Sequence, residues 1–323
     1  MNLRFAIYYL LILVLPGIAV RAQSIDSSFR KRYLKNNVVE FYPGIYNTQY
    51  RFVTYRQPAK NFRMQANSSA YAGIFVKYKW LSVSFSTAMP GTHLDNDIKF
   101  RYTSLRFSFG IRGMFFNPYY YSYDGLLIAH HHHEGFEVFR NMQVTGSGAD
   151  FYYYTNTNHF SFRSSNLFTE KQLHSAGSLY IVATPQWQKM DWRTPSQSFV
   201  MDSLTYKLLS GNPEWISLLI CPGYAYNISL NAGHWLITPA AAIGGGLVKE
   251  INRRDAGVQP AFRMQGRVNA GYSTDKFYFF MRRQWDNLQT NLLIKNMHQV
   301  NSRISLTVGY RFKSLKNKIL GIV

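Results

Sequence analysis

Apolar and polar residues alternate one by one over several segments of this chain. From residue 103 to 112, every second position holds Thr, Leu, Phe or Ile, and the positions between hold Ser, Arg or Gly. Residues 262–272 and 302–312 repeat this pattern, and residues 81–86 show it on a smaller scale. Because successive side chains of a strand point to opposite faces, each segment predicts a strand with one apolar and one polar face.

Residues 215–248 contain no Asp, Glu, Lys or Arg, yet they do not predict a membrane-spanning helix. Pro222, Pro239 and the glycines at 244–246 would each interrupt a helix. The segment instead predicts two apolar strands joined by a hairpin turn at 231–234.

Alternation alone also fits a soluble sandwich, so other features must identify the solvent. The patterned segments are long enough for the roughly 9–11 residues of a tilted membrane strand. Their polar faces carry Gly, Ser, Asn, Gln and Arg, and Tyr272 and Phe312 lie at the ends of their apolar faces. This distribution is typical of a wet lumen and an interfacial aromatic girdle.

The connections near the C-terminus also alternate in length. We expect short turns at 231–234 and 273–276 and longer ones at 249–260 and 286–299. Short periplasmic turns alternating with longer outer loops are typical of outer-membrane barrels. Two further irregular regions, 123–148 and 188–214, suit outer loops, although either could fold inward as a plug.

A sheet that faces lipid must close on itself, because the bilayer offers no partner for an edge strand. We therefore predict an all-β chain with a single antiparallel transmembrane β-barrel of about 12 strands, with about 10–14 allowed by the even-number rule. The barrel is expected at 45–312, after a periplasmic lead-in at 23–44 and before a short basic periplasmic tail at 313–323. The predicted location is the bacterial outer membrane.

The first residues predict export. A basic residue, Arg4, precedes an apolar stretch at 5–20, and small residues flank Arg21 before Gln23. This order is typical of a cleaved secretory signal peptide, which we place at 1–22. Its removal takes away Arg4 and Arg21 and lowers the formal net charge from +20 to +18.

The amino-acid composition excludes several classes of protein and of binding partner. The chain has 36 Lys and Arg against 16 Asp and Glu, but only 16% of its residues are charged and 17% are aromatic, which argues against a disordered basic tail. Its basic residues alternate with apolar ones and do not cluster, so we expect no nucleic-acid binding. A single cysteine, Cys221, excludes an intrachain disulfide.

Several segments resemble a family of exported bacterial proteins described as a domain of unknown function, number four-four-two-one. The resemblance rests on residues 160–163 (Phe-Ser-Phe-Arg), 170–172 (Glu-Lys-Gln), 175–178 (Ser-Ala-Gly-Ser), 222–227, 309–312, 78–81 and 119–125. The sequence departs from the family pattern at Phe162 and Lys171, where Tyr and Arg are expected. The resemblance implies an outer-membrane barrel and no catalytic role.

Six basic residues are predicted to line the lumen, because each lies on the polar face of a predicted strand: Lys77, Arg106, Arg263, Arg267, Arg303 and Arg311. A positive lumen would concentrate anions. Alternatively, these residues pair with carboxylates such as Glu170, Asp275 and Asp286, or exposed basic residues bind lipopolysaccharide outside.

The run His130, His131, His132, His133 followed by Glu134 supplies competent metal ligands. A flexible consecutive run does not define a geometry, so we favour a solvated loop and predict neither a metal site nor a cofactor.

His159 and Ser161 lie two residues apart, and on a strand they would share one face. They form the weak basis of an alternative function, a barrel-embedded lipid hydrolase with His159 as base and Ser161 as nucleophile. Position 173, where such an enzyme would place a third polar residue, is Leu. We therefore favour a structural role for this pair.

The leading functional hypothesis is a non-enzymatic small channel, binding barrel or structural barrel with a basic lumen. Its expected partners are outer-membrane lipid and lipopolysaccharide, together with anionic solutes. The sequence does not predict an oligomeric state.

Overall fold

A computed structural model describes residues 26–33, 37–53, 62–66, 70–92, 101–111, 113–129, 136–193, 203–253, 256–292 and 295–313. The predicted signal peptide, the His130–His133 run and all of the predicted tail after Lys313 lie outside these residues. No helix among the described residues is long and apolar enough to cross a membrane.

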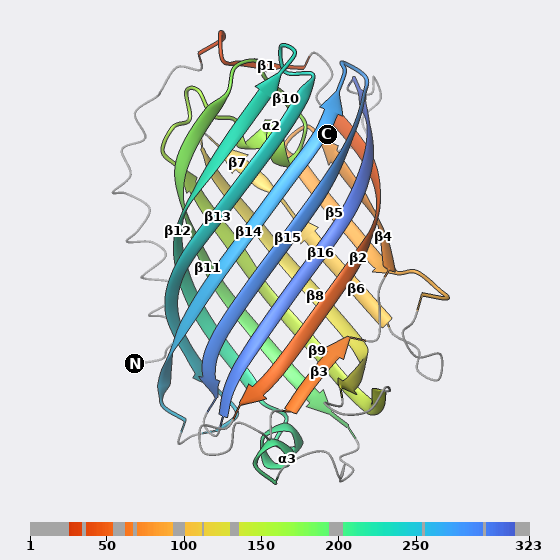
Figure 1. The fold of residues 1–323 in the computed structure, drawn as a ribbon, viewed down its shortest axis with the longest axis vertical. Coiled ribbons are helices and arrows are strands. Elements are labelled where there is room, and N and C mark those ends of the chain that lie inside the picture. The colour runs from red at the N-terminus through yellow and green to blue at the C-terminus, as the bar shows by residue number, and fades with distance from the viewer. Residues whose placement is uncertain are drawn as a thin grey trace, which may run out of the picture.

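Twelve antiparallel strands form one closed barrel, as predicted (Figure 1). They are β2 (Asn37–Val53), β4 (Ala70–Tyr78), β5 (Leu81–Ala88), β6 (Arg101–Phe107), β8 (Met114–Ala129), β9 (Phe136–Tyr154), β11 (Ala176–Trp192), β12 (Glu214–Leu230), β13 (Trp235–Glu250), β14 (Val258–Ser273), β15 (Phe277–Leu292) and β16 (Lys295–Phe312). The barrel closes where β16 pairs with β2, from Asn296 opposite Val53 to Phe312 opposite Asn37. Its first strand therefore begins at Asn37 and not at 45, so the second half of the predicted lead-in belongs to the wall.

The two ends of the barrel differ in their connections. One end carries the start of β2, the end of β16 and the short turns after β12 and β14, and we call it the periplasmic end. The predicted hairpin turn at 231–234 lies there, with Asn231 and Ala232 at φ of 50° and Gly233 at 80°. Positive φ at consecutive positions matches the twist of a tight hairpin. We call the opposite end of the barrel the outer end.

Two predicted outer loops are largely strand. Residues 123–129 and 136–148 pair across β8 and β9, and β15 and β16 pair from Leu292 opposite Lys295 onward. The prediction of a long connection at 286–299 was therefore wrong. Gln, Asn and Thr in that stretch occupy strand positions that point alternately inward and outward. In the third region, 188–214, β11 runs to Trp192 and helix α3 (Ser203–Ser210) follows.

The wall is built differently at its two ends. Strand β3 (Phe62–Ala66) pairs with β2 and with β8 near the outer end. Over the periplasmic part, β4, β5 and β6 stand between β2 and β8 instead. These three strands have nine, eight and seven residues, whereas the other nine wall strands have 16 to 19. The wall beside β2 therefore contains fewer strands near the outer end than near the periplasmic end.

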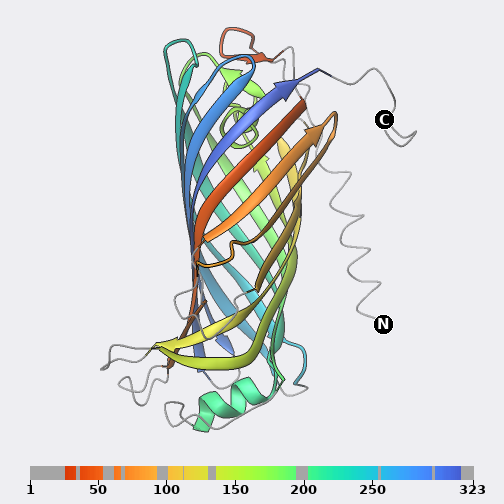
Figure 2. The same cartoon turned by 90° about the vertical axis from the view of Figure 1, so that its right-hand side faces the viewer.

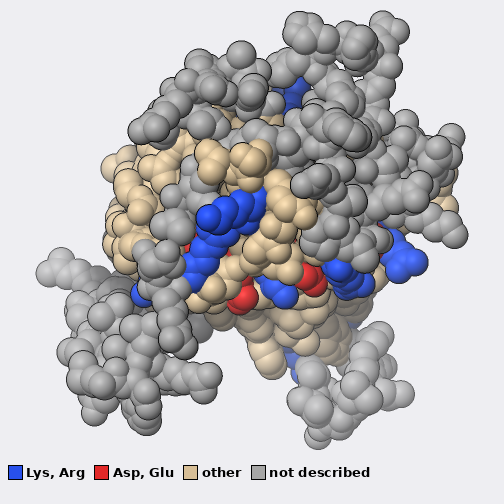
Figure 3. Space-filling view, turned by 90° about the horizontal axis from the view of Figure 1, so that it is seen from below, with Lys and Arg blue, Asp and Glu red and all other residues tan. Residues whose placement is uncertain are grey.

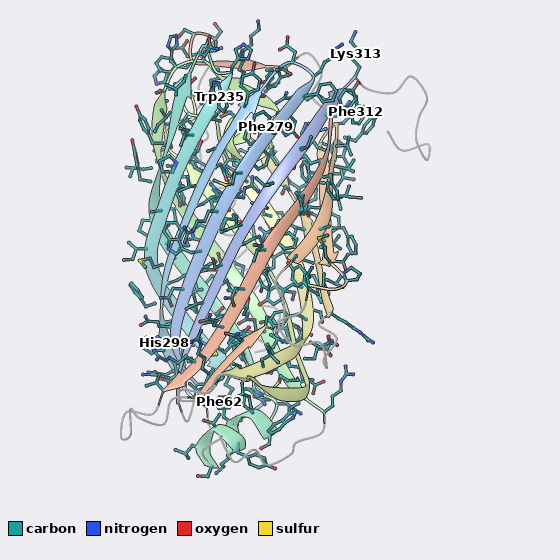
Figure 4. The ribbon with its side chains drawn as sticks, turned by 45° about the vertical axis from the view of Figure 1, so that its right-hand side comes forward. Phe62, Trp235, Phe279, His298, Phe312 and Lys313 are labelled. Atoms are coloured by element: carbon teal, nitrogen blue, oxygen red, sulfur yellow. The ribbon has the colours of Figure 1, made fainter. Side chains whose placement is uncertain are left out.

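The outer surface of the barrel is apolar. On β16, Leu306 and Val308 are 58% and 60% exposed, whereas Arg311 on the inward face is fully buried. Trp235, Phe279 and Phe312 lie near the periplasmic end, with Lys313 just beyond them (Figure 4). A closed sheet with an apolar exterior and an aromatic girdle identifies an outer-membrane β-barrel.

Segments outside the twelve wall strands lie at both ends of the barrel, and Figure 2 shows helix α3 at the outer one. At the outer end, Leu208 and Leu209 of α3 are fully buried in an apolar cluster with Met64, Trp215 and Met297. At the periplasmic end lie helix α2 (Phe162–Asn166), strand β10 (Glu170–Gln172) and strand β1 (Arg30–Arg32), which pairs with β10. We call residues 155–175 the plug. The plug folds inward. It lies outside 123–148 and 188–214, the two regions for which the sequence allowed an inward fold.

Candidate functional site

A polar chamber of about 330 Å³ lies inside the barrel between the two filled ends. Phe162, Asn166 and Leu167 of the plug line its periplasmic side, and Leu219 and Leu288 of the outer apolar cluster line the opposite side. Its walls are rich in tyrosine and arginine. This volume is at the lower end of the range of small-molecule pockets.

Inward positions of the long strands supply the charges of this chamber. Four of the six basic residues predicted from the sequence line it, namely Arg106, Arg263, Arg267 and Arg303. Lys77 and Arg311 are not among the lining residues, because both are buried nearer the periplasmic end. Arg282 also lines the chamber, and the acidic residues in its walls are Glu40, Asp150 and Asp286.

Arg282 could not be assigned to the lumen from the sequence, because Arg283 follows it directly. Two adjacent arginines place one on each face, and the pattern around them did not show which one points inward. The sequence does place Arg282 on the same strand face as Tyr278 and Phe280, which are both buried, and this spacing could have identified Arg282 as the inward one.

Two of the lining arginines are neutralised by carboxylates. Arg263 donates to both oxygens of Asp286, from Nε at 2.9 Å and from a terminal nitrogen at 2.7 Å. Arg106 lies 3.2 Å from Asp150, which also accepts a hydrogen bond from Thr184 at 3.0 Å. The alternative of pairing inside the lumen therefore describes these two residues.

Three lining arginines have no carboxylate of the described residues within 4.0 Å: Arg267, Arg282 and Arg303. Instead, the guanidinium of Arg303 lies 5.3 Å from the ring centre of Tyr46 and 5.1 Å from that of Tyr71. Aromatic faces attract a guanidinium but leave its charge in place. These residues give the chamber its excess positive charge.

The plug is joined to the wall by a buried amide. Asn227 of β12 donates to the carbonyl of Ser161 at 3.0 Å and to the side chain of Gln172 at 2.9 Å. It accepts a hydrogen bond from Thr238 at 2.7 Å. Residues 160–163 and 170–172, on which the family resemblance rests, therefore belong to the closure of the periplasmic end.

Charged residues outside the membrane-spanning strands hold the plug as well. Glu170 accepts from Arg30 of β1 at 2.5 Å and from the Ser161 hydroxyl at 2.7 Å. Arg163 donates to the carbonyl of Gly110 at 2.6 Å, and burial lowers the pKa of its guanidinium. Glu170 therefore pairs with Arg30 at the rim and does not neutralise a chamber arginine.

The periplasmic end also buries Tyr33, which precedes β2. Its hydroxyl lies 2.8 Å from that of Ser273, and Arg311 stacks on its ring. Burial raises the pKa of this phenol, although the charge of Arg311 opposes the effect. Tyr33 is therefore neutral and hydrogen-bonded at ordinary pH.

His159 and Ser161 do not lie on a strand, contrary to the sequence prediction. His159 is in a turn, and Ser161 caps α2 by accepting a hydrogen bond from the Ser164 backbone at 3.1 Å. The His159 ring lies 3.5 Å from Asp26, whose pKa is lowered chiefly by hydrogen bonds from Ser28. Among the described residues, the Ser161 hydroxyl bonds to Glu170 and to the Ser164 backbone, and no hydrogen bond joins it to the His159 side chain.

Metal ligands do not gather in the described part of the chain, where no three or more His, Cys, Asp or Glu residues form a group that could hold an ion. Cys221 is a free, buried cysteine on the inward face of β12. Neither observation bears on His130–His133, which the structure does not describe.

A family described as "Domain of unknown function (DUF4421)" matches residues 24–312. No curated protein matches the sequence. Among solved structures, an outer-membrane channel from Pseudomonas putida F1 has 10% identity and a TM-score of 0.40, over 90% of this chain and 100% of that chain. The β-domain of the Bordetella autotransporter BrkA has 11% identity and a TM-score of 0.39, over 84% and 99%. The outer-membrane protease OmpT of Escherichia coli has 8% identity and a TM-score of 0.31, over 87% and 99%.

Proposed function

The chain belongs to the family described as a domain of unknown function (DUF4421), and for this member we propose a non-enzymatic outer-membrane barrel that binds a small anionic solute in its chamber. One observation carries the proposal: five arginines but only three carboxylates line a chamber inside the barrel, between the plug and the outer apolar cluster. Field lines concentrate in such a low-dielectric cavity and favour an anion inside it.

Binding is favoured over steady conduction because both ends are filled by packed residues. At the periplasmic end, Asn227, Arg282 and Arg311 all hydrogen-bond to the plug. At the outer end, Leu208 and Leu209 are fully buried. A continuous pore would require both closures to move, so we expect this conformation to retain a solute and not to conduct freely.

Lipopolysaccharide is the second proposed partner, on the outside of the barrel. Lys and Arg side chains gather on the described surface of the outer end, with acidic side chains between them (Figure 3). Lys207, Lys249 and Arg51 are exposed and belong to elements that end there. Basic side chains at this boundary would meet the phosphates of an anionic outer leaflet.

Equilibrium binding to the full chain in detergent micelles tests the proposal. Glucose 6-phosphate and glucose are suitable probes, because they differ by one phosphoryl group, and isothermal titration at low salt compares their affinities. We expect measurable binding of the phosphorylated sugar that weakens as salt rises, and no binding of glucose. Equal affinity for the two, or no binding of the anion, would overturn the proposal.

Planar-bilayer recording tests the closed state independently. We expect no steady conductance from the intact chain. A large, permanently open and cation-preferring conductance would contradict a closed basic chamber.

A further inference from the structure

Arg267, Gln284 and Arg303 lie in one row across three adjacent strands. Arg267 of β14 is opposite Gln284 of β15, and Gln284 is opposite Arg303 of β16. Arg282 occupies the next inward position of β15, beside this row. Side chains at directly opposite and diagonal positions of neighbouring strands are within reach of one another, so Arg282 is a close neighbour of both Arg267 and Arg303 on the chamber wall.

Hydrogen bonds fix the orientation of Arg282. Its Nε donates to the side chain of Asn269 at 2.9 Å, and a terminal nitrogen donates to the carbonyl of Asn166 in the plug at 3.1 Å. Arg303 donates to the Tyr102 hydroxyl at 2.6 Å. Both guanidiniums are thus held by neutral acceptors.

Arg267 has a buried donor without a partner. Its Nε has no hydrogen-bond acceptor, while the rest of its guanidinium interacts with the Tyr154 hydroxyl and lies 5.9 Å from the ring centre of Phe162. The structure therefore contains a buried N–H group that requires an acceptor, and leaving such a donor unsatisfied is unfavourable.

The charge of Arg282 is also repelled by its two basic neighbours. Arg282 is close enough to Arg267 and Arg303 to be affected by both of their charges, and Glu40 is the acidic residue that opposes them. Glu40 accepts a hydrogen bond from Tyr278 at 2.6 Å and forms no ion pair within 4.0 Å with the described basic residues. Crowded guanidiniums in a cavity are stabilised by a ligand of opposite charge.

We infer that Arg267, Arg282 and Arg303 form a site for a tetrahedral oxyanion, the phosphate or sulfate group of a small polar solute. A doubly charged group with several acceptor oxygens fits three guanidiniums better than a single carboxylate does, because each guanidinium can donate to a separate oxygen. The tyrosine rings beside Arg303 would contact the body of the solute. This inference rests on the proposed function and assigns the charged end of its ligand.

Inorganic phosphate and sulfate, titrated into the full chain in detergent at low salt, are the probes, with acetate as the monovalent comparison. We expect phosphate and sulfate to bind more tightly than acetate. Arg267→Gln and Arg303→Gln should each weaken phosphate binding about 10- to 100-fold, the loss expected for one charge-assisted hydrogen-bonding group.

Arg283→Gln is the matched control, because this exposed residue is next to Arg282 on β15 but points outward. We expect its phosphate affinity to equal that of the unmodified chain. Heat-modifiable gel migration verifies that each variant forms a barrel, so a folding defect is distinguished from a binding defect.

Arg106→Gln removes the same net charge from the chamber at a position that is paired with Asp150. If it weakens phosphate binding as much as Arg267→Gln does, the chamber is uniformly basic and the three-arginine site is wrong, while the proposed function survives. If acetate binds as tightly as phosphate and sulfate, the oxyanion assignment is wrong. If the unmodified chain binds none of the three anions, the proposed function fails as well.

Discussion

The guanidinium of Arg311, near the end of the last strand, lies 3.7 Å from the ring centre of Tyr33, which precedes the first strand of the barrel. Arg311 is fully buried and also donates to the carbonyls of Phe168 in the plug and Thr274 in the β14–β15 turn. One side chain therefore joins the N-terminal segment, the plug and the rim of the wall. It was predicted to line the lumen but belongs to the periplasmic closure instead.

Arg311→Ala should loosen the periplasmic closure without preventing barrel formation. The change leaves two buried carbonyls without their charged donor, and each such hydrogen bond contributes about 1.5–3 kcal/mol. We expect an earlier heat-induced shift in gel migration and faster proteolysis at residues 26–33. Tyr33→Phe is the control, because it keeps the ring and loses only the Ser273 contact, so its effect should be smaller. Equal melting of Arg311→Ala and the unmodified chain would refute this role.

Alkaline pH should destabilise the same closure through Tyr33. Its folded pKa is raised by burial, so the folded state retains the phenol proton at a pH where the unfolded chain releases it. Stability from this residue is therefore complete below the ordinary tyrosine pKa of about 10 and is lost as pH rises from there through the folded pKa. Proteolysis of residues 26–33 should accelerate above about pH 10. Tyr33→Phe should show a smaller acceleration, and an identical pH profile would exclude Tyr33 as the cause.

Ser161→Ala should lower the stability of the plug. We expect no change in enzymatic activity, because we expect the unmodified chain to have none. The hydroxyl caps α2 and donates to Glu170, and replacing such a cap by alanine costs about 0.5–2 kcal/mol. Denaturant unfolding in detergent should show this loss, and Ser161→Thr should recover part of it. An ester-cleavage assay on the same proteins addresses the hydrolase alternative. Cleavage by the unmodified chain that disappears in Ser161→Ala would establish the enzyme that we do not expect.

Asn227→Asp should destabilise the plug more strongly than its small change in shape implies. The new carboxylate would face the Ser161 carbonyl and the Gln172 side-chain oxygen, both of which now accept hydrogen bonds from the amide. The Ser164 hydroxyl and the Ser161 N–H still donate to these two oxygens, so each hydrogen bond lost from Asn227 costs about 0.5–1.5 kcal/mol, and the buried charge adds to that cost. Asn231→Asp in the exposed hairpin turn is the matched control, expected within about 0.5 kcal/mol of the unmodified chain. Similar unfolding curves for the two variants would show that Asn227 does not anchor the plug.

The strand faces could be predicted from the sequence, because every strand of a membrane barrel has one face toward lipid and one face toward the polar interior. Leu306 and Val308 face outward and Arg303 faces the chamber, as the pattern over residues 302–312 indicates. Both the polar and the apolar environment act on each strand, so periodicity alone identifies the two surfaces.

The plug and the three-arginine site could not be predicted in this way, because they depend on contacts between distant residues. Ser161 and Asn227 are 66 residues apart in the sequence, and the pairing of β11 with β12 and the inward fold of the plug bring them together. Likewise, Arg263 and Arg267 look equivalent in the sequence, since both lie on the polar face of one strand. In the register of β14 and β15, Asp286 is opposite Gln265 and diagonal to both arginines, and only the folded side chains pair it with Arg263 and leave Arg267 without a carboxylate.

Gly266→Ala should destabilise the barrel through Trp285, the residue opposite it on β15. A β-carbon built at Gly266 would lie 1.9 Å from the indole, so the Trp285 ring must move away from the wall. An aromatic ring packed over a cross-strand glycine is a known stabilising arrangement, and overpacking of this kind costs about 1–3 kcal/mol. The double variant Gly266→Ala/Trp285→Ala should lose no more stability than Trp285→Ala alone, because the clash has been removed. Unfolding in detergent of the two single variants and the double variant gives the coupling energy, and strict additivity would show that the two residues do not interact.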